Sequence, residues 1–470
     1  MKRYSTIALA AVAIAAAAGC KDNAVVNPID APTVDALSGP LTRVTLQQLA
    51  TGALAQDRGT ADGFAYLVEP GIWARDIYRI DASEPRFVQE TLGGNPDPGS
   101  FSGSGAWNGY YTAMRAENTL ILALANAPAS QFTTAEVNAT KGFFRTMKAL
   151  ELWRVIEMHD TVGATIQTDD PNAVTDVRCK TAVLAYIAAL LDSANTDLGA
   201  AGAATVVPFN LPTGFTAFGR DYSKVSNIVL FNRGLKGKID FYRALDRTNP
   251  NAALFTTAIN ELTTALGAGP GAVPASQFKT GAYYVFVPGG SENTPNAISD
   301  SKTGLNPGVQ DSIQAGDTRA SKIVPRTTLT GFGLSTTITY SGAVASTANQ
   351  AAPLGILRDE ELVLLRAQAE IEAGQFANAV LDVNSVRTNY GLSATAFATQ
   401  AAGRTAVLYE KRYSLLYEGP QRMDDLREYK YLNATYHKPE TTTDPYNAAL
   451  PIPRGELNAR SLTVNPACTP

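Results

Sequence analysis

Residues that build metal centres are scarce in this sequence. Its 470 residues include 3 cysteines and only two histidines, His159 and His437. Neither a CxxC pair nor an HExxH motif occurs, and zinc sites are commonly built on such spacings. The sequence therefore predicts no metal site and no cofactor.

An excess of positive charge is also missing. Lys and Arg together number 39 against 43 Asp and Glu, and no block of basic residues occurs. A nucleic-acid-binding protein needs a clustered positive face. We therefore expect no nucleic-acid partner.

Sequence motifs of nucleotide and acyl-transfer chemistry are absent as well. The glycine cluster "GSFSGSGAWNG" at 99–109 lacks the GxGxxG spacing, and no strand pattern precedes it. No P-loop and no nucleophile elbow is present. We interpret the cluster as a loop rather than a phosphate-binding turn.

Long apolar runs are rare, and the one near the start is short. Ile7–Ala18 follows Lys2 and Arg3 and ends at Gly19-Cys20, which is the pattern of a secretory signal. A membrane-spanning helix needs roughly 20 apolar residues, and no later segment reaches that length. We expect residues 1–19 to be removed and the remaining chain to be exported.

The sequence "AAAGC" around Cys20 is similar to the lipobox of bacterial lipoproteins, with Ala17 where Leu is usual. In such proteins the cysteine thiol carries the lipid, and two or more acyl chains give stable anchoring. An ordinary signal peptide with a chance cysteine is the alternative. Residues 20–40, with Pro28, Pro32 and Pro40, are then expected to form a flexible tether from lipidated Cys20.

Two further cysteines, Cys179 and Cys468, remain in the exported chain. In an oxidising compartment they could form a disulfide, but two unpaired thiols fit the sequence equally well. Their pairing is left open by the sequence.

Helical segments recur in pairs along the chain. Thr133 to Glu136 has capping-box spacing, and behind it Phe143, Met147 and Leu150 share one helical face. Later helices are expected in 186–198, in 224–245 and 251–266 around the turn "DRTNP", and in the pair "RDEELVLLRAQAEIEAG" and "QFANAVLDVNSVRTNYG". Alanines at the expected helix crossings are Ala367, Ala369, Ala373, Ala377 and Ala379.

This pattern predicts a mainly α fold made of tetratricopeptide-like helical hairpins. We expect a single domain over residues 41–470. Three long insertions rich in Gly, Pro, Ser, Thr and Asn interrupt it, at about 72–109, 206–222 and 267–353. Long loops inside a compact domain are usually functional or disordered, and the aromatic residues in these insertions favour function.

Several motifs, in order, resemble the SusD/RagB family of surface lipoproteins. These are "WNGYYTAMRAENTLI" (107–121), "KGFFRTMKALELWRVIEMHDTVGATI", "DEELVLLRAQAEIEAGQFANAVLDVNSVRTNYGL", "YEKRYSLLYEG" with "RMDDLREY", and "LPIPRGELNAR". The chain departs from the family pattern at Ser414, where a second Glu is usual, at Gln368, where an acidic residue is expected, and in the extra residue before Arg422.

The resemblance implies a SusD-like fold and a function in nutrient uptake. Such a protein would be lipid-anchored in the outer membrane and face the exterior. It would bind an oligosaccharide or oligopeptide without catalysis and deliver it to a SusC-like, TonB-dependent transporter barrel. A surface glycan-degrading enzyme and a helical-repeat scaffold for protein interactions are the alternatives.

Candidate ligand contacts lie in two of the insertions. Aromatic faces with a few oriented polar groups commonly bind such ligands. The first insertion offers Trp73, Arg75, Asp76, Tyr78, Arg79 and Asp81, and the third offers Tyr283 and Tyr284 in an expected short strand with one buried face. Phe332 and Tyr340 are weaker candidates, and an equally good interpretation is that these aromatics pack the loops onto the helices.

The stretch "LYEKRYSLLYEGPQRMDDLREYKY" (408–431) combines charges of both signs with apolar residues. Glu410 and Glu418 would lie about 12 Å apart along one helix face, at 1.5 Å per residue, which is too far for a glycosidase pair. We therefore expect Leu408, Leu415 and Leu416 to face the core and a structural charge network to brace the helix ends. Its members are Glu410, Arg412, Glu418, Arg422 and Asp425.

Overall fold

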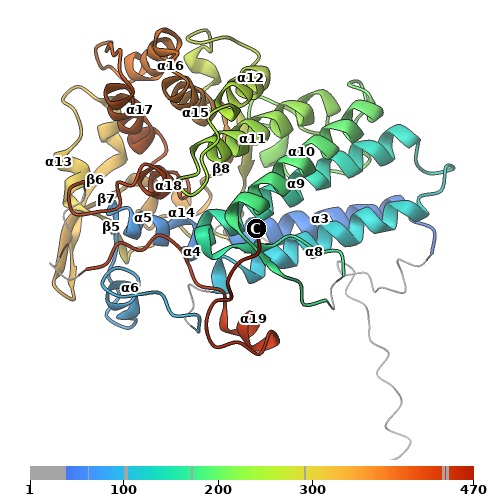
Figure 1. Ribbon diagram of the computed structural model, residues 1–470, viewed down its shortest axis with the longest axis horizontal. Helices are drawn as coiled ribbons and strands as arrows, with labels where there is room; N and C mark the ends of the chain where they lie inside the picture. The colour runs from blue at the N-terminus through green and yellow to red at the C-terminus, as the bar shows by residue number, and fades with distance from the viewer. Residues whose placement is uncertain are drawn as a thin grey trace, which may run out of the picture.

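The computed structural model describes residues 39–61, 63–99, 104–170, 173–289, 293–436, 440 and 444–470. Cys20, the signal segment and the tether up to residue 38 lie outside the described residues. The fold is mainly α, as predicted (Figure 1).

The long helices pack against one another largely in chain order, as expected for helical hairpins (Figure 1). They are α3 (Arg43–Ala61), α8 (Asn108–Ala123), α9 (Thr134–His159), α10 (Lys180–Ala201), α11 (Val225–Leu245), α12 (Leu254–Leu266), α15 (Asp359–Glu372), α16 (Phe376–Asn389) and α17 (Gln400–Ser414), followed by the shorter α18 (Gln421–Glu428). The tetratricopeptide-like scaffold is therefore confirmed in outline.

Local signals at the helix ends act as the sequence predicts. Thr133 and Glu136 form both hydrogen bonds of a capping box at the start of α9. Gly374, between α15 and α16, has φ +74°, a conformation that glycine adopts without the steric cost of a side chain.

The alanine prediction for the α15–α16 crossing is only partly right. Ala367, Ala369 and Ala379 are fully buried, and small residues there let the two helices approach closely. Ala373 and Ala377 are exposed, because they lie at the turn where the two helices separate.

The insertions carry more regular structure than predicted. They contain short helices and antiparallel two-stranded sheets. The strand pairs are β1 (Ile77–Arg79) with β5 (Thr303–Leu305), β4 (Gly281–Tyr284) with β8 (Leu354–Arg358), and β6 (Ile323–Gly331) with β7 (Leu334–Tyr340), and a further pair outside the insertions is β2 (Ala164–Thr165) with β3 (Val177–Arg178). Within the insertions lie the short helices α6 (Arg86–Gln89), α13 (Pro307–Asp311) and α14 (Thr347–Gln350) and the 3₁₀ turns η3 (Thr213–Phe215), η4 (Ala275–Gln277), η5 (Thr318–Lys322) and η6 (Ser341–Ala343). Outside them or at their edge lie α4 (Phe64–Leu67), α5 (Glu69–Trp73), α19 (Arg454–Ala459), η1 (Leu124–Asn126) and η2 (Asp160–Val162).

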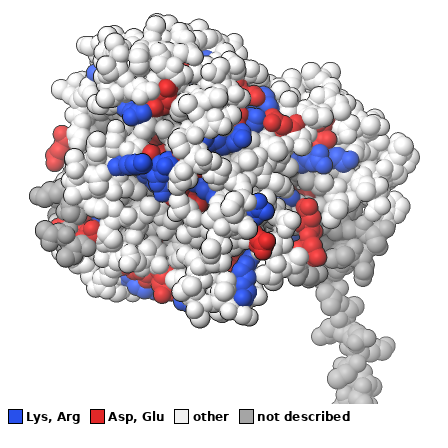
Figure 2. All heavy atoms as spheres, viewed as in Figure 1, with Lys and Arg blue, Asp and Glu red and all other residues white. Residues whose placement is uncertain are grey.

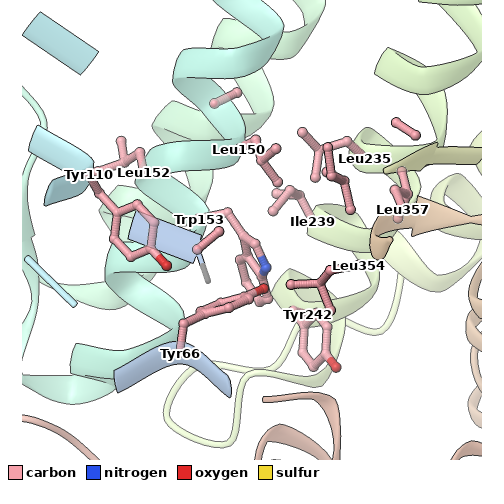
Figure 3. Packing of buried hydrophobic residues seen from close by; sticks show 14 of the residues in the cluster. Tyr66, Tyr110, Leu150, Leu152, Trp153, Leu235, Ile239, Tyr242, Leu354 and Leu357 are labelled. Carbon is pink, nitrogen blue, oxygen red and sulfur yellow. The ribbon is translucent and has the colours of Figure 1, made fainter. Parts of the chain in front are cut away.

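The main core lies between the helices and the β4–β8 sheet. Trp153 of α9 stacks on Tyr242 of α11 with ring centroids 4.9 Å apart, and Leu354 and Leu357 of β8 belong to the same buried cluster (Figure 3). Trp107, Trp153 and Phe144 are core residues. Helix α9 is buried on every side from Thr146 onward, so this part of it is a central helix and not an amphipathic one.

Charged residues of α9 are buried together with its apolar ones. Arg154, 1% exposed, forms an ion pair with Asp57 of α3 at 2.5 Å. The hydroxyl of Tyr284 donates to the same Asp57 carboxylate at 2.7 Å. Because a buried charge is costly unless it is paired, these contacts fix how α3, α9 and β4 pack together.

Cys179 and Cys468 form a disulfide, which settles the pairing that the sequence left open. Their Cα atoms are 4.8 Å apart although the residues are separated by 289 positions. Cys179 immediately precedes α10. The bond therefore links the C-terminal segment to the start of a core helix.

The surface seen in Figure 2 carries Lys, Arg, Asp and Glu in mixed order, without a broad region of one sign. Within the described ranges, no helix is both long and apolar enough to span a membrane. Among the same residues, no group of three or more His, Cys, Asp or Glu is arranged to hold a metal ion.

Candidate functional site

A pocket of about 350 Å³ lies at the base of the β6–β7 hairpin. Small-molecule sites typically span about 300–1,000 Å³. Its walls carry the aromatic rings Tyr283, Tyr340, Tyr390 and Tyr417. They also carry the charged residues Lys279, Lys322, Arg358, Glu360 and Glu418. We call it the Tyr340 pocket.

Strand pairing brings its two central residues together. Ile323 of β6 lies opposite Tyr340 of β7, so Lys322, the residue before β6, is placed beside the end of β7. The Tyr340 ring is half-buried and stacks on Tyr417 with centroids 4.8 Å apart and planes 11° from parallel. Burial raises the pKa of Tyr340 to about 12, so the phenol is neutral at physiological pH.

Tyr417 holds an unusual backbone conformation. Its φ is +65°, in the left-handed region where a bulky residue costs of order 1–3 kcal/mol. Such strain persists only where the surroundings impose it. Here it turns the chain between α17 and α18 so that the ring stays buried beneath Tyr340.

Tyr283 enters the pocket from β4. It pairs in register with Gly355 of β8. Its hydroxyl donates to the main-chain oxygen of Lys279 at 2.7 Å, and its ring stacks on Phe218 at 4.3 Å. The position of Tyr283 is therefore fixed before any ligand binds.

One guanidinium joins the two carboxylates of the pocket. Arg358 donates to both oxygens of Glu418, at 2.6 and 2.9 Å, and it also forms an ion pair with Glu360. Although burial opposes it, Arg358 lowers the pKa of Glu360 below its usual value. Arg358 therefore holds both carboxylates of the pocket in place.

Lys322 is bound differently from Arg358. Its Nζ donates to the main-chain oxygens of Tyr413 at 2.8 Å and Ser414 at 2.6 Å, at the C-terminus of α17. Burial lowers the pKa of Lys322 to about 8.

The predicted ligand contacts of the first insertion lie elsewhere. The Trp73 ring is 3% exposed, and its Nε1 donates to the Thr91 oxygen at 3.0 Å. Tyr78 is 7% exposed, and its hydroxyl accepts from Asn306 at 3.0 Å. Both rings therefore pack inside the protein.

The charged residues of that insertion form ion pairs within the molecule. Their partners are Glu440 for Arg75 at 2.7 Å, Arg412 for Asp76 at 2.6 Å, Asp300 for Arg79, and Lys302 for Asp81 at 2.5 Å. None of the six predicted contacts from 73–81 lines the Tyr340 pocket. Of the predicted pair in the third insertion, Tyr283 lines this pocket, whereas Tyr284 points to Asp57 and both faces of β4 are buried rather than one.

The predicted charge network is visible, with a changed geometry. Glu410 pairs with Arg319 at 2.6 Å and with Arg387 at 3.0 Å. Asp425 pairs with Lys411 at 2.8 Å, and Arg422 lies 3.9 Å from Asp76. Leu408, Leu415 and Leu416 are buried as expected.

The expectation that Glu410 and Glu418 share one helix face is wrong. Helix α17 ends at Ser414, and Glu418 lies in the following turn, where it contributes to the pocket. The left-handed Tyr417 and the φ of +120° at Gly419 break the helix, a conformation that helical spacing alone does not reveal.

The departures from the family pattern are accommodated by neighbouring polar groups. The hydroxyl of Ser414 accepts from Arg319 at 3.0 Å. Gln368 accepts from Lys411 at 2.7 Å and donates to Asp425 at 2.9 Å. Both side chains therefore take part in the buried network without adding charge.

Sequence reasoning did not find Lys322, Arg358, Glu360 or Tyr417 as site residues. Arg358 and Glu360 stand in "RDEE" at the start of a predicted helix, and Tyr417 in the stretch read as helical bracing. Their meeting depends on contacts across about 60 residues of chain, such as Arg358 with Glu418. No local pattern carries that information.

Comparisons with known proteins agree with the architecture. Residues 306–462 match the model of the SusD family. Among curated proteins, none matches the chain.

Solved structures of the SusD superfamily share the fold over nearly the whole chain. One from Bacteroides thetaiotaomicron has a TM-score of 0.65 at 14% identity, covering 91% of this chain and 100% of its own. A laminarin binding SusD-like protein has a TM-score of 0.65 at 15% identity, covering 89% and 98%. NanU of B. fragilis has a TM-score of 0.64 at 14% identity, covering 92% and 97%.

At these identities the similarity establishes the fold, while the family match over residues 306–462 includes the β6–β7 hairpin and helices α15 to α19. Residues 306–462 therefore match the SusD family, and a SusD-like fold extends over most of the chain.

Proposed function

We propose that this protein binds an oligosaccharide in the Tyr340 pocket and passes it, without chemical change, to a TonB-dependent transporter barrel of the SusC type. Lipidated Cys20 would hold it to the outer membrane, facing the exterior. The observation that carries the proposal is the half-buried Tyr340 ring, stacked on Tyr417 at 4.8 Å within a pocket rich in fixed polar groups.

Sugars are commonly bound by an aromatic face together with oriented polar groups. The pocket offers both, because Arg358 and Glu418 hold each other in place through two hydrogen bonds. The similar proteins described as laminarin binding and as carbohydrate binding support a glycan over a peptide as the ligand.

The arrangement of the carboxylates favours binding over hydrolysis. A glycosidase needs a carboxylic acid with a raised pKa and a second free carboxylate. In this pocket both carboxylates contact Arg358, and the pKa of Glu360 is lowered. A glycan-degrading enzyme is therefore the weaker alternative.

The binding site is tested by titrating a panel of oligosaccharides into the purified protein and following the products by chromatography. We expect binding without turnover, and Tyr340→Ala should weaken it about tenfold, since aromatic contacts contribute about 0.5–1.5 kcal/mol beyond buried area. Tyr436→Ala, which changes a tyrosine that is 54% exposed, is the control. Unchanged affinity in Tyr340→Ala, or product formed on prolonged incubation, would contradict the proposal.

Anchoring is tested separately by cell fractionation. Cys20→Ala with an intact signal should release the protein from the membrane, because the acyl chains have no other attachment point in this proposal. A variant that stays membrane-bound would remove the lipoprotein assignment but leave the binding site untouched.

A further inference from the structure

The charges that line the Tyr340 pocket do not cancel. The pocket has the cations Lys279, Lys322 and Arg358 and the anions Glu360 and Glu418. Both carboxylates are bound to Arg358. Among the described residues neither lysine forms an ion pair with a carboxylate, and the three cations exceed the two anions by one charge.

Of the two lysines, Lys322 is the better placed to donate a hydrogen bond to a ligand in the pocket. An ammonium group has three N–H donors, and the oxygens of Tyr413 and Ser414 take two of them. No described carboxylate forms an ion pair with this nitrogen at 4.0 Å or less. One donor therefore remains for a group that enters the pocket.

The surroundings of Lys322 make a charged partner favourable. A partly buried cation that has no carboxylate in direct contact has lost hydration that an anion can replace, and hydrogen bonds between ionised groups are stronger than those to neutral hydroxyls. Lys279, exposed at the pocket rim, adds to the same field. Glu360 and Glu418 oppose it, and Arg358 offsets one of their two negative charges.

Lys322 also has a purely structural role, because it caps the C-terminus of α17. Its two carbonyl partners, Tyr413 and Ser414, are the last residues of that helix, where a cation is favoured by the helix dipole. Capping accounts for two donors. It does not account for the third donor or for the opening of Lys322 onto the pocket.

We propose that the preferred ligand of the Tyr340 pocket is an acidic glycan whose carboxylate, as in a uronic acid, pairs with Lys322 while the sugar ring packs on Tyr340. The proposal rests on the function proposed above and narrows the class of its ligand. Lys279 would contribute to attraction at the rim.

The test compares oligogalacturonides and alginate oligomers with their methyl esters and with neutral glucans of equal length, by titration calorimetry. We expect the free acids to bind about tenfold more tightly than the esters at 50 mM salt, the scale of one charged hydrogen bond. The difference should shrink at high salt because exposed and partly exposed charges are screened.

Variants separate ligand binding from helix capping. Lys322→Met should abolish the difference between acid and ester, Lys322→Arg should retain most of it, and the exposed-lysine control Lys224→Gln should change neither affinity. Thermal unfolding shows whether each variant is folded. If Lys322→Met weakens acid and ester equally, capping is the only role of Lys322 and the proposal is overturned.

Failure of this proposal can be told apart from failure of the proposed function. Neutral glucans binding as tightly as the acids, with Tyr340→Ala weakening both, would overturn the acidic ligand and leave glycan binding intact. If none of these glycans binds, both proposals are overturned.

Discussion

At the scale of single residues, the stretch 408–431 works mainly as internal bracing, with one exception. Glu410, Lys411, Asp425 and Arg427 are buried and paired. The exception is the turn after α17, where Tyr417 and Glu418 help to form the Tyr340 pocket. The positive φ angles of Tyr417 and Gly419 thus mark the turn that has a proposed binding role, while the helices on either side of it have a structural one.

Glu410 offers a direct test of the bracing role. Glu410→Gln should reduce the free energy of unfolding by about 3 kcal/mol, because Arg319 and Arg387 would lose the carboxylate that both contact. Urea titration at pH 7 measures the change. Glu84→Gln, which alters an exposed pair with Arg86, should leave the unfolding midpoint nearly unchanged, and an equally small effect at Glu410 would contradict the bracing role.

At the scale of elements, the start of helix α9 is fixed by its N-terminal cap, and its C-terminal half is stabilised by burial on all sides. The capping box at Thr133 satisfies donors that the first turn leaves open. Farther along, the charged side chains of α9 are buried against neighbouring helices, and this burial depends on the partners that tertiary packing supplies.

The cap can be tested without touching the core. Thr133→Ala should lower the free energy of unfolding by about 1 kcal/mol, since the side-chain oxygen that accepts from Glu136 would be lost. Thr134→Ala changes the adjacent exposed threonine and should have a smaller effect. Equal effects of the two substitutions in denaturant titrations would show that the capping hydrogen bonds add little.

At the scale of the whole molecule, contacts distant in sequence connect the helices to the insertions. The disulfide joins Cys179 to Cys468, Asp76 connects the first insertion to Arg412, and Arg358 connects β8 to Glu418. These links make the pocket depend on the correct packing of several separate segments.

Through His159, the stability of this packing depends on pH. The ring is fully buried at the end of α9, and burial lowers its pKa to about 4. As the pH falls below the unfolded value of about 6.5, the unfolded chain binds a proton first, so stability should fall between pH 6.5 and 4 at about 1.4 kcal/mol per unit.

The measurement is the free energy of unfolding at pH 7 and pH 5. The native protein should lose about 2 kcal/mol more across this interval than His159→Gln, which cannot titrate there. Other groups titrate in both proteins, so the difference between the two isolates His159. Parallel pH profiles would contradict the assignment.

Local patterns determined much of the fold. The capping box, the helix pairs, the glycine turn at Gly374 and the buried leucines of 408–416 are all readable because helix spacing and turn chemistry depend on neighbouring residues. The family motifs were readable for the same reason, as short runs in a fixed order.

The tertiary structure decided which aromatic residues are open to a ligand and which charges are left unpaired. Trp73 and Tyr340 are both aromatic residues in predicted loop insertions, yet the Trp73 ring packs in the core and the Tyr340 ring lies half-buried over Tyr417. Lys322 lacks a carboxylate because Arg358, distant along the chain from Glu418, takes both carboxylates of the pocket. Such outcomes depend on distances between segments far apart in sequence, and residue spacing along the chain does not determine those distances.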